Sequence, residues 1–227
     1  MIRQLVIASR NEKKLRELKR YLKGVKAKVS TLKDFEGAPE VVENGATFLK
    51  NAKKKALTVS RFTKGLVLAD DSGLVVEALH GRPGVRSSRF TGPRKSDEAN
   101  NLKLLKLLEN VPLAKRQAKF VCAVAIADNG RIIKSIEEDC KGLIAFSPSG
   151  RYGFGYDPVF IIPKYNKTFG ELGLKVKDKM SHRSKALKKA REFLKNYLNQ
   201  VHARDIPCVN LVQKSSEPDT RYHSFMI

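Results

Sequence analysis

The chain has 227 residues, 41% of them hydrophobic, which suits one globular domain or two closely packed lobes and excludes a string of independent domains. Its apolar runs are too short to cross a bilayer or to act as a secretory signal, and its three scattered cysteines exclude a disulfide framework, so we expect a cytoplasmic protein with no membrane partner. The formal charge of +22, from 45 Lys and Arg against 23 Asp and Glu, favours polyanionic partners such as nucleic acid or nucleotides with several phosphates, although a solvated lysine-rich surface would give the same count.

The first part of the chain alternates between predicted strands and helices. Residues 2–8 form an apolar run typical of a buried strand, and Asn11 then precedes leucines at helical spacing, which predicts a helix capped by Asn11. Residues 29–32 predict a second short strand. A helix over 47–61 and a strand over 65–69 follow, so the pattern favours parallel strand pairing near the N-terminus.

The second part of the chain adds a hairpin signal, because Asn129 and Gly130 form a two-residue turn between apolar runs. The predicted elements here are, in order, an extended segment at 74–79, a loop at 81–93, a helix at 96–109 capped by Ser96, strands at 119–127, 131–137, 143–146 and 159–162, and a helix from about residue 181. Residues 206–227 lose all periodicity, so we expect a domain over 1–205 and a C-terminal extension over 206–227. The fold class is therefore α/β, and its polar clusters fall at strand ends and in loops, where ligands bind in open sheets.

The first polar cluster follows the first strand and opens the first helix. It consists of Ser9, Arg10, Asn11, Glu12, Lys13 and Lys14. A helix N-terminus offers unpaired N–H groups and a positive dipole end, so this segment is a candidate phosphate site; the alternative is a capped helix with surface lysines.

The second cluster places Asp70 and Asp71 side by side at the end of an apolar strand, followed by Ser72. Adjacent carboxylates repel and are costly to bury, and a divalent cation removes that cost. Magnesium prefers carboxylate, water and phosphate oxygens, so the pair is a candidate metal or acid–base site, with an acidic turn as the alternative. Glu43 is a further candidate ligand, and Glu40 is equally available.

Two further segments carry aromatic and cationic groups. The run Gly153 to Pro158 places Phe154 between two glycines, where its flat ring can stack on a base or simply fill a core. Near the start of the last helix, Lys177, His182 and Arg183 offer donors for a nucleotide, and Ser181 is a candidate cap. No Ser–His–Asp or Cys–His motif is present, so water is the expected nucleophile.

These segments resemble the inosine triphosphate pyrophosphatase family, also called the XTP/dITP pyrophosphatases. The matching stretches are IASRNEKKLRELK, ENGATFLKNAKKKA, LADDSGLVVEALHGRPGVRSSRF, GFGYDPVFIIP, KTFGEL and KDKMSHRSKAL, in the family's order and over nearly all of residues 2–198. The resemblance implies an elongated α/β fold with a mixed sheet, flanking helices and two lobes around a central substrate cleft, usually as a homodimer. It also implies hydrolysis of ITP, dITP and XTP to the monophosphate and pyrophosphate with Mg²⁺ as cofactor.

The resemblance also implies roles for individual residues. Ser9, Asn11 and Lys14 match the triphosphate-binding motif, to which Arg10, Glu12 and Lys13 belong. Glu43 and Asp71 match the magnesium ligands, Asp71 also matches the proposed proton acceptor, and Asp70 is the neighbouring acid. The remaining matches are substrate-binding positions: Ser72, Phe154, Gly155, Tyr156, Asp157, Lys177, His182 and Arg183. We expect Lys14 and Lys177 to stabilise the leaving pyrophosphate, and His182 and Arg183 to donate to the purine 6-carbonyl.

Four positions depart from the family pattern, namely Arg10, Lys50, Arg86 and the pair Arg151-Tyr152, and we expect three of them to add positive charge near the cleft. The sequence leaves open an enzyme of the same fold that acts on other modified nucleotides, such as pyrimidine triphosphates. It also leaves open a basic nucleic-acid-binding protein, although the carboxylate pairs suit magnesium better than a phosphate backbone, and no specific nucleic-acid partner is expected.

Overall fold

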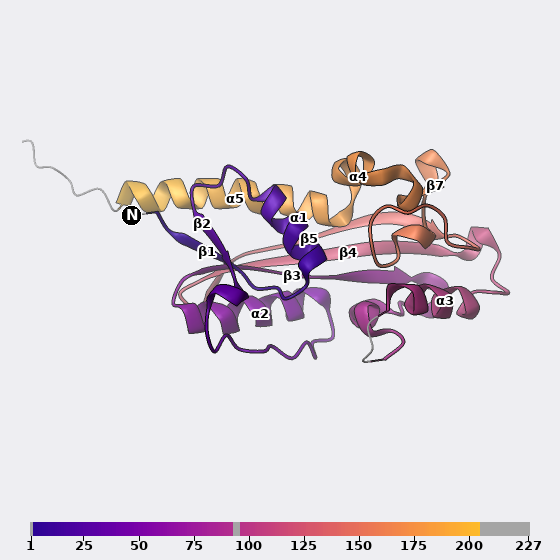
Figure 1. Ribbon diagram of the computed structural model, residues 1–227, viewed down its shortest axis with the longest axis horizontal. Coiled ribbons are helices and arrows are strands. Elements are labelled where there is room, and N and C mark those ends of the chain that lie inside the picture. The colour runs from indigo at the N-terminus through magenta and orange to yellow at the C-terminus, as the bar shows by residue number, and fades with distance from the viewer. Residues whose placement is uncertain (1, 93–95, 205–227) are drawn as a thin grey trace, which may run out of the picture.

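A mixed sheet runs the length of the molecule, and the helices pack around it (Figure 1). The computed structural model describes residues 2–92 and 96–204, and within them the sheet has seven strands in the order β2-β1-β3-β4-β5-β6-β7. The strands are β1 (Gln4–Ile7), β2 (Lys28–Thr31), β3 (Leu66–Val76), β4 (Gln117–Asp128), β5 (Arg131–Ile144), β6 (Phe160–Ile162) and β7 (Lys167–Thr168). β1 pairs in parallel with β2 and β3, and the remaining neighbours are antiparallel.

Five α-helices flank this sheet in the described residues: α1 (Glu12–Tyr21), α2 (Phe48–Thr63), α3 (Asp97–Leu107), α4 (Phe169–Met180) and α5 (His182–Arg204). Alternate residues of a strand face opposite sides of a sheet. In β3, Leu66 and Leu68 pack with α1 and α5, whereas Val67 and Ala69 pack with α2. Figure 1 shows the same arrangement, with α5 and α2 on opposite sides of the long strands.

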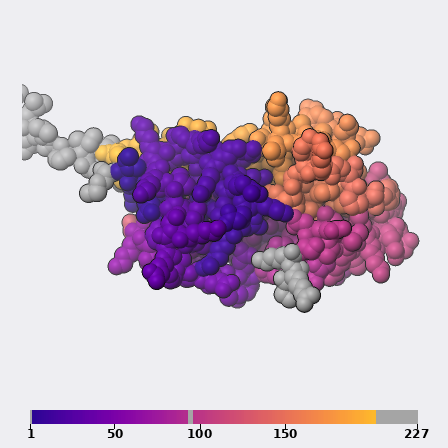
Figure 2. All heavy atoms as spheres, viewed as in Figure 1, coloured from indigo at the N-terminus to yellow at the C-terminus, as the bar shows by residue number. Residues whose placement is uncertain are grey.

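The later part of the chain builds a second end of the molecule around its own apolar cluster. Leu104 of α3, Phe160 of β6 and Phe169 of α4 meet there with the far ends of β3 and β4. In the space-filling view, the indigo N-terminal segments cover one half of the visible face, and the magenta and orange segments cover the other (Figure 2). The expected two-lobed, elongated α/β architecture is confirmed, with β3, β4 and β5 running through both ends.

The predicted caps are confirmed at α1, where Asn11 accepts hydrogen bonds from the backbone N–H groups of Lys13 and Lys14, and at α3, where Ser96 accepts from that of Ala99. The boundary at Asp70 is wrong: β3 does not end there but continues to Val76, because β4 pairs with it throughout. Similarly, the predicted strand at 143–146 overlaps the end of β5. None of the described helices is both long enough and apolar enough to cross a membrane. The predicted extension at 206–227 lies outside the described residues.

The site owes its position to the different lengths of β1 and β3. β1 pairs with β3 only as far as Ile7 opposite Leu68, and the chain then turns away into α1. The following residues of β3, from Asp70 to Gly73, therefore lie beside the carboxyl end of β1, where an open α/β sheet commonly binds its ligands.

Candidate active site

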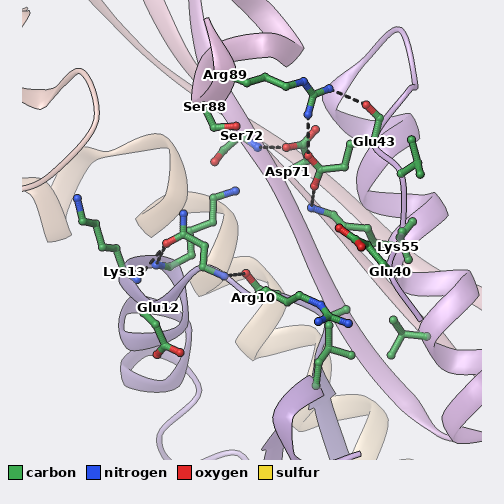
Figure 3. Close-up of a pocket in the computed structure, with 18 of the residues that line it drawn as sticks. Arg10, Glu12, Lys13, Glu40, Glu43, Lys55, Asp71, Ser72, Ser88 and Arg89 are labelled. Atoms are coloured by element: carbon green, nitrogen blue, oxygen red, sulfur yellow. Dashed lines mark hydrogen bonds and ion pairs between the residues drawn. The ribbon is translucent and has the colours of Figure 1, made fainter. Parts of the chain in front are cut away.

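Two adjoining cavities open at this point. The larger has a volume of about 970 Å³ and the smaller about 100 Å³. They share six lining residues, which are Asn11, Lys14, Ser72, Ser88, Asp97 and Phe154, so they form one continuous cleft. Figure 3 shows the larger cavity, with Glu43, Lys55, Asp71 and Arg89 close together on one side and Arg10 and Lys13 across from them.

The N-terminus of α1 forms one wall of the larger cavity. The side-chain oxygen of Asn11 caps the helix with bonds of 3.0 and 3.1 Å to the N–H groups of Lys13 and Lys14, which fixes the turn at the end of β1. The backbone N–H of Asn11 in turn donates to Ser9 Oγ at 3.3 Å. A helix N-terminus with lysines in its first turn attracts a phosphate.

Two residues of this turn have partners outside the cavity interior. The carboxylate of Glu12 pairs with Lys33 and points away from the other labelled side chains (Figure 3). Arg10 donates to the carbonyl of Ala38 at 2.9 Å and so ties this turn to the loop that carries Glu43. Of the four departures from the family pattern, Arg10 alone is found in the described lining of either cavity.

Asp70 lies behind the cavities and is fully buried. Its side chain is 0% exposed, and its Oδ2 lies 3.1 Å from Lys14 Nζ and 3.6 Å from Arg183 Nε. Burial raises the pKa of the carboxyl, but Lys14, Arg183 and Lys55 outweigh burial and lower the pKa to about 2. A carboxylate with so low a pKa is a weak base, so its placement suits an anchor for cations and argues against proton transfer.

Asp71 faces the other side of β3 and lines the larger cavity. Its Oδ2 accepts from Asn51 Nδ2 at 2.9 Å and its Oδ1 from the N–H of Ser72 at 2.9 Å. Burial raises the pKa of Asp71, and the negative charge of Glu43 raises it further, against the lowering effect of Lys14 and Lys55. Adjacent positions in one strand therefore carry two carboxylates of different character, one a weak base and the other a stronger one.

Glu43 belongs to the loop before α2 and is held by two cations. Lys55 Nζ lies 2.5 Å from Glu43 Oε1, and Arg89 donates to the Glu43 carbonyl at 2.7 Å. The same Lys55 Nζ donates to the carbonyl of Asp70 at 2.5 Å. Lys55 therefore connects the loop that carries Glu43 to the strand that carries Asp71.

The donor chemistry of this cavity fits a Mg²⁺ ion held by two carboxylates. Glu43 and Asp71 both line the cavity, and Glu43 is close enough to raise the pKa of Asp71. Each oxygen of Asp71 accepts a single hydrogen bond, which leaves lone pairs for a cation. In residues 2–92 and 96–204, no group of three His, Cys, Asp or Glu side chains forms a closed metal site. Magnesium commonly takes one or two protein carboxylates and completes its shell with water and phosphate oxygens.

The glycine-rich loop presents Phe154 to both cavities. The N–H of Phe154 donates to Asp157 Oδ2 at 2.8 Å, and Lys177 Nζ lies 2.5 Å from the same oxygen. Gly153 has φ of +83°, and a Cβ there would lie 2.1 Å from Asp157 Oδ2, so a glycine is required. Lys177 also lies 4.7 Å from the centroid of the Phe154 ring. It lines only the smaller cavity, so its geometry favours the base side of the cleft over the leaving pyrophosphate.

His182 and Arg183 form the inner end of the smaller cavity. The His182 ring stacks on Phe120 at 4.7 Å, and burial together with Arg183 holds the pKa of His182 well below its usual value, so the imidazole is neutral. Arg183 donates to Glu17 Oε2 and to Ser72 Oγ, both at 2.7 Å. No described residue hydrogen-bonds His182 Nδ1 or Arg183 Nε, and the latter faces the buried Oδ2 of Asp70 at 3.6 Å.

The structure brings nearly all of the predicted site residues into this cleft. The larger cavity is lined by Ser9, Arg10, Glu12, Lys13, Glu43 and Asp71. The smaller is lined by Gly155, Tyr156, Asp157, Lys177, His182 and Arg183. The positions in both are Asn11, Lys14, Ser72 and Phe154. Asp70 alone among the predicted residues lines neither, and the alternative carboxylate Glu40 also lines the larger cavity.

Sequence reasoning missed five residues that hold this site together: Glu17, Asn51, Lys55, Arg89 and Asp97. Helical spacing contained a signal for three of them. Glu17 lies three residues after Lys14, and Lys55 lies four after Asn51, so each pair shares a helix face. No local pattern indicates Arg89 or Asp97, because their partners lie far away in the chain.

Comparison with known proteins places this architecture in a family. A dITP/XTP pyrophosphatase of Desulforamulus reducens is 51% identical over 199 residues, covering 87% of this chain and 98% of that protein. A dITP/XTP pyrophosphatase of Geobacillus kaustophilus is 48% identical over 191 residues, covering 84% and 94%. The solved structure of a HAM1 protein from Coxiella burnetii superimposes with a TM-score of 0.79 at 36% identity, covering 86% of this chain and 100% of that one. The model of the Ham1 family matches residues 5–193, and this chain therefore belongs to the Ham1 family.

Proposed function

We propose that this protein hydrolyses the non-standard purine nucleotides ITP, dITP and XTP to a nucleoside monophosphate and pyrophosphate. The observation that carries the proposal is one cleft whose large part combines the N-terminus of α1 with Glu43 and Asp71, and whose small part ends at His182 and Arg183, with Phe154 facing both. A triphosphate suits the first part and a purine the second. The relatives named dITP/XTP pyrophosphatase, 48–51% identical over most of their length, support dITP and XTP as substrates.

The large part of the cleft would bind and cut the triphosphate. Lys14 and the N-terminus of α1 would hold phosphate oxygens, with Asp70 keeping the Lys14 ammonium in place. Asp71 would accept a proton from water, which attacks the α-phosphorus in line with the bond to the bridging oxygen. The position of Asp71 supports this role, because its carboxylate lines the larger cavity and each of its oxygens accepts a single hydrogen bond, which leaves lone pairs for a proton. The pyrophosphate leaves as that bond breaks, and Lys14 and Lys55 would stabilise its charge.

We propose that Mg²⁺ is the cofactor and that Glu43 and Asp71 hold it. The chemistry that Mg²⁺ supplies in such a site is neutralisation of charge on the phosphate oxygens. Lys55 and Arg89 would keep Glu43 directed into the cavity.

The small part of the cleft would choose the base. Phe154 would stack on the purine, and His182 and Arg183, which line this cavity, would offer donors to a 6-carbonyl. Hypoxanthine and xanthine have an acceptor at this position, whereas adenine presents an amino donor and would leave two donors facing each other. A homodimer remains a prediction from the family resemblance, and a cytoplasmic location remains a prediction from the short apolar runs of the sequence.

A panel of nucleotides tests the proposal. Pyrophosphate release should be fast from ITP, dITP and XTP and at least ~10²-fold slower from ATP, on the scale of hydrogen-bond mismatches, and it should need Mg²⁺. GTP, dUTP and TTP belong in the same panel, because fast release from a pyrimidine would favour a related pyrophosphatase of other modified nucleotides. Comparable kcat/KM values for ATP and ITP would contradict the proposal.

A further inference from the structure

Asp97, the first residue of α3, joins the two parts of the cleft and belongs to none of the motifs described above. It lines both cavities. One oxygen, Oδ2, accepts from Lys13 Nζ at 2.7 Å and from the backbone N–H of Gly155 at 3.0 Å. Lys13 belongs to the turn at the N-terminus of α1, which lines the larger cavity, and Gly155 directly follows Phe154. A single carboxylate oxygen therefore contacts both halves of the site.

α3 holds the Gly155 residue from both sides. One turn beyond Asp97, Asn101 Nδ2 donates to the carbonyl of Gly155 at 3.0 Å. Residues four apart share a helix face, so the N–H and the C=O of Gly155 are bound by the same face of α3. Gly155 has φ of +63°, and this conformation directs the chain immediately after Phe154. The attachment to α3 therefore fixes the peptide that directly follows Phe154.

The other bond of Asp97 binds the ammonium of Lys13, which would also attract a triphosphate. Lys13 is the second residue of α1, lines the larger cavity and lies 5.7 Å from the Phe154 ring centroid. Its side chain is 51% exposed and that of Asp97 is 46% exposed, so this ion pair is weak enough to exchange. A substrate phosphate and the Asp97 carboxylate would compete for the same ammonium.

We propose that Asp97 is a positioning residue with two tasks: it anchors the Gly155 peptide so that Phe154 faces the base, and it binds Lys13 until substrate phosphate takes its place. The inference rests on the proposed function, because it assigns the phosphate to the Lys13 side and the purine to the Phe154 side. A carboxylate is needed for the second task, whereas any acceptor of similar shape serves the first.

Two ligands separate these tasks by equilibrium binding, measured by calorimetry. Tripolyphosphate probes the Lys13 side without a base, and inosine monophosphate probes the base side. Asp97→Asn keeps an acceptor for Gly155 but removes the charge, and Asp97→Ala removes both. Glu98→Gln is the matched control, because Glu98 lies one residue further in the same helical turn, is exposed and is in neither cavity lining.

Asp97→Asn should bind tripolyphosphate ~2- to 5-fold more tightly, the scale of an exposed ion pair, and should bind inosine monophosphate within ~2-fold of wild type. Asp97→Ala should show the same gain for tripolyphosphate and a ~3- to 10-fold loss for inosine monophosphate, the scale of one lost hydrogen bond. Glu98→Gln should change neither affinity by more than ~1.5-fold, because an exposed charge that contacts neither ligand contributes little.

A double-mutant cycle isolates the Lys13 contact from the general field of the protein. In a Lys13→Met background, Asp97→Asn should leave tripolyphosphate affinity nearly unchanged. An equal gain in both backgrounds, no gain in either, or no tripolyphosphate binding by wild type would overturn the proposal. These readouts need no turnover. If the Asp97 predictions fail while wild type still hydrolyses ITP, the proposed function stands and only the role of Asp97 is refuted. Intact coupling without hydrolysis of ITP, dITP or XTP would instead defeat the proposed reaction.

Discussion

The buried carboxylate of Asp70 gives a quantitative test of how the site is held together. Asp70→Asn preserves the shape of the side chain and removes its charge, which leaves Lys14 and Arg183 facing an amide. The pKa of Asp70 is lowered from 3.8 to about 2. This lowering of the pKa corresponds to about 2 kcal/mol of unfolding free energy that the ionised carboxylate contributes at neutral pH.

The contribution has a defined pH dependence. Because the pKa is lower in the folded state, the stabilisation is complete above the unfolded-state pKa of about 4 and is lost as the pH falls toward 2. We expect Asp70→Asn to lower the free energy of unfolding by about 2 kcal/mol at pH 7 and by about 1 kcal/mol at pH 3. For a chain of this size the loss at pH 7 lowers Tm by ~4–8 °C.

Urea unfolding followed by circular dichroism at pH 7, 5 and 3 measures this difference. The matched control is Asp139→Asn, because in the described part of the chain no cation lies within 4 Å of the Asp139 carboxylate, and we expect little change from it at any pH. A destabilisation by Asp70→Asn that stays constant from pH 7 to pH 3, or none at all, would refute the view that the carboxylate is held ionised by its cations.

Two further predictions concern the carboxylate and the cation of the larger cavity. Asp71→Asn should reduce kcat by at least ~10²-fold in a pyrophosphate-release assay, since it removes the proposed base; a kcat within a few-fold of wild type would exclude that role. Lys55→Met should reduce kcat/KM by at least ~10-fold and lower the free energy of unfolding by ~1–3 kcal/mol, because it leaves Glu43 and the Asp70 carbonyl without their shared donor. Lys53→Met, two residues earlier on the same helix, serves as the control, and equal effects from both variants would show that the Lys55 contacts do not matter.

Helix caps and hairpin turns could be predicted from the sequence, because their signals lie within a few neighbouring residues. Asn11 and Ser96 cap helices where the sequence indicates, and the turn at Asn129 and Gly130 joins the expected hairpin. The extent of β3 could not be predicted in this way. Two aspartates inside a strand look like its end, and only the pairing with β4 and the cations around Asp70 make the continuous strand possible.

The helix α4 illustrates another limit of sequence patterns. Its two glycines, Gly170 and Gly173, weaken any helical signal, and Gly173 has a non-helical φ of 71° within the helix. The capping box of Thr168 and Glu171, in which each side chain bonds the other's backbone N–H, sets its start. Gly173 therefore obscures the helical pattern of α4, whereas the capping box of Thr168 and Glu171 would have indicated where the helix begins.

Family resemblance supplied most of the candidate site, whereas the supporting contacts depended on the fold. Glu43, Asp71 and Phe154 could be named from motifs. The bond from Asn51 to Asp71 and the bonds of Asp97 to Lys13 and Gly155 join segments far apart in the chain. Spacing within one segment cannot predict such contacts, because they depend on how distant elements pack.

The position of bond cleavage tests the central claim most directly. Hydrolysis of dITP in ¹⁸O-labelled water, analysed by mass spectrometry, should place the label in the nucleoside monophosphate and leave the released pyrophosphate unlabelled, because in the proposed reaction water attacks the α-phosphorus. Release of orthophosphate with formation of dIDP, or label in pyrophosphate, would contradict the account.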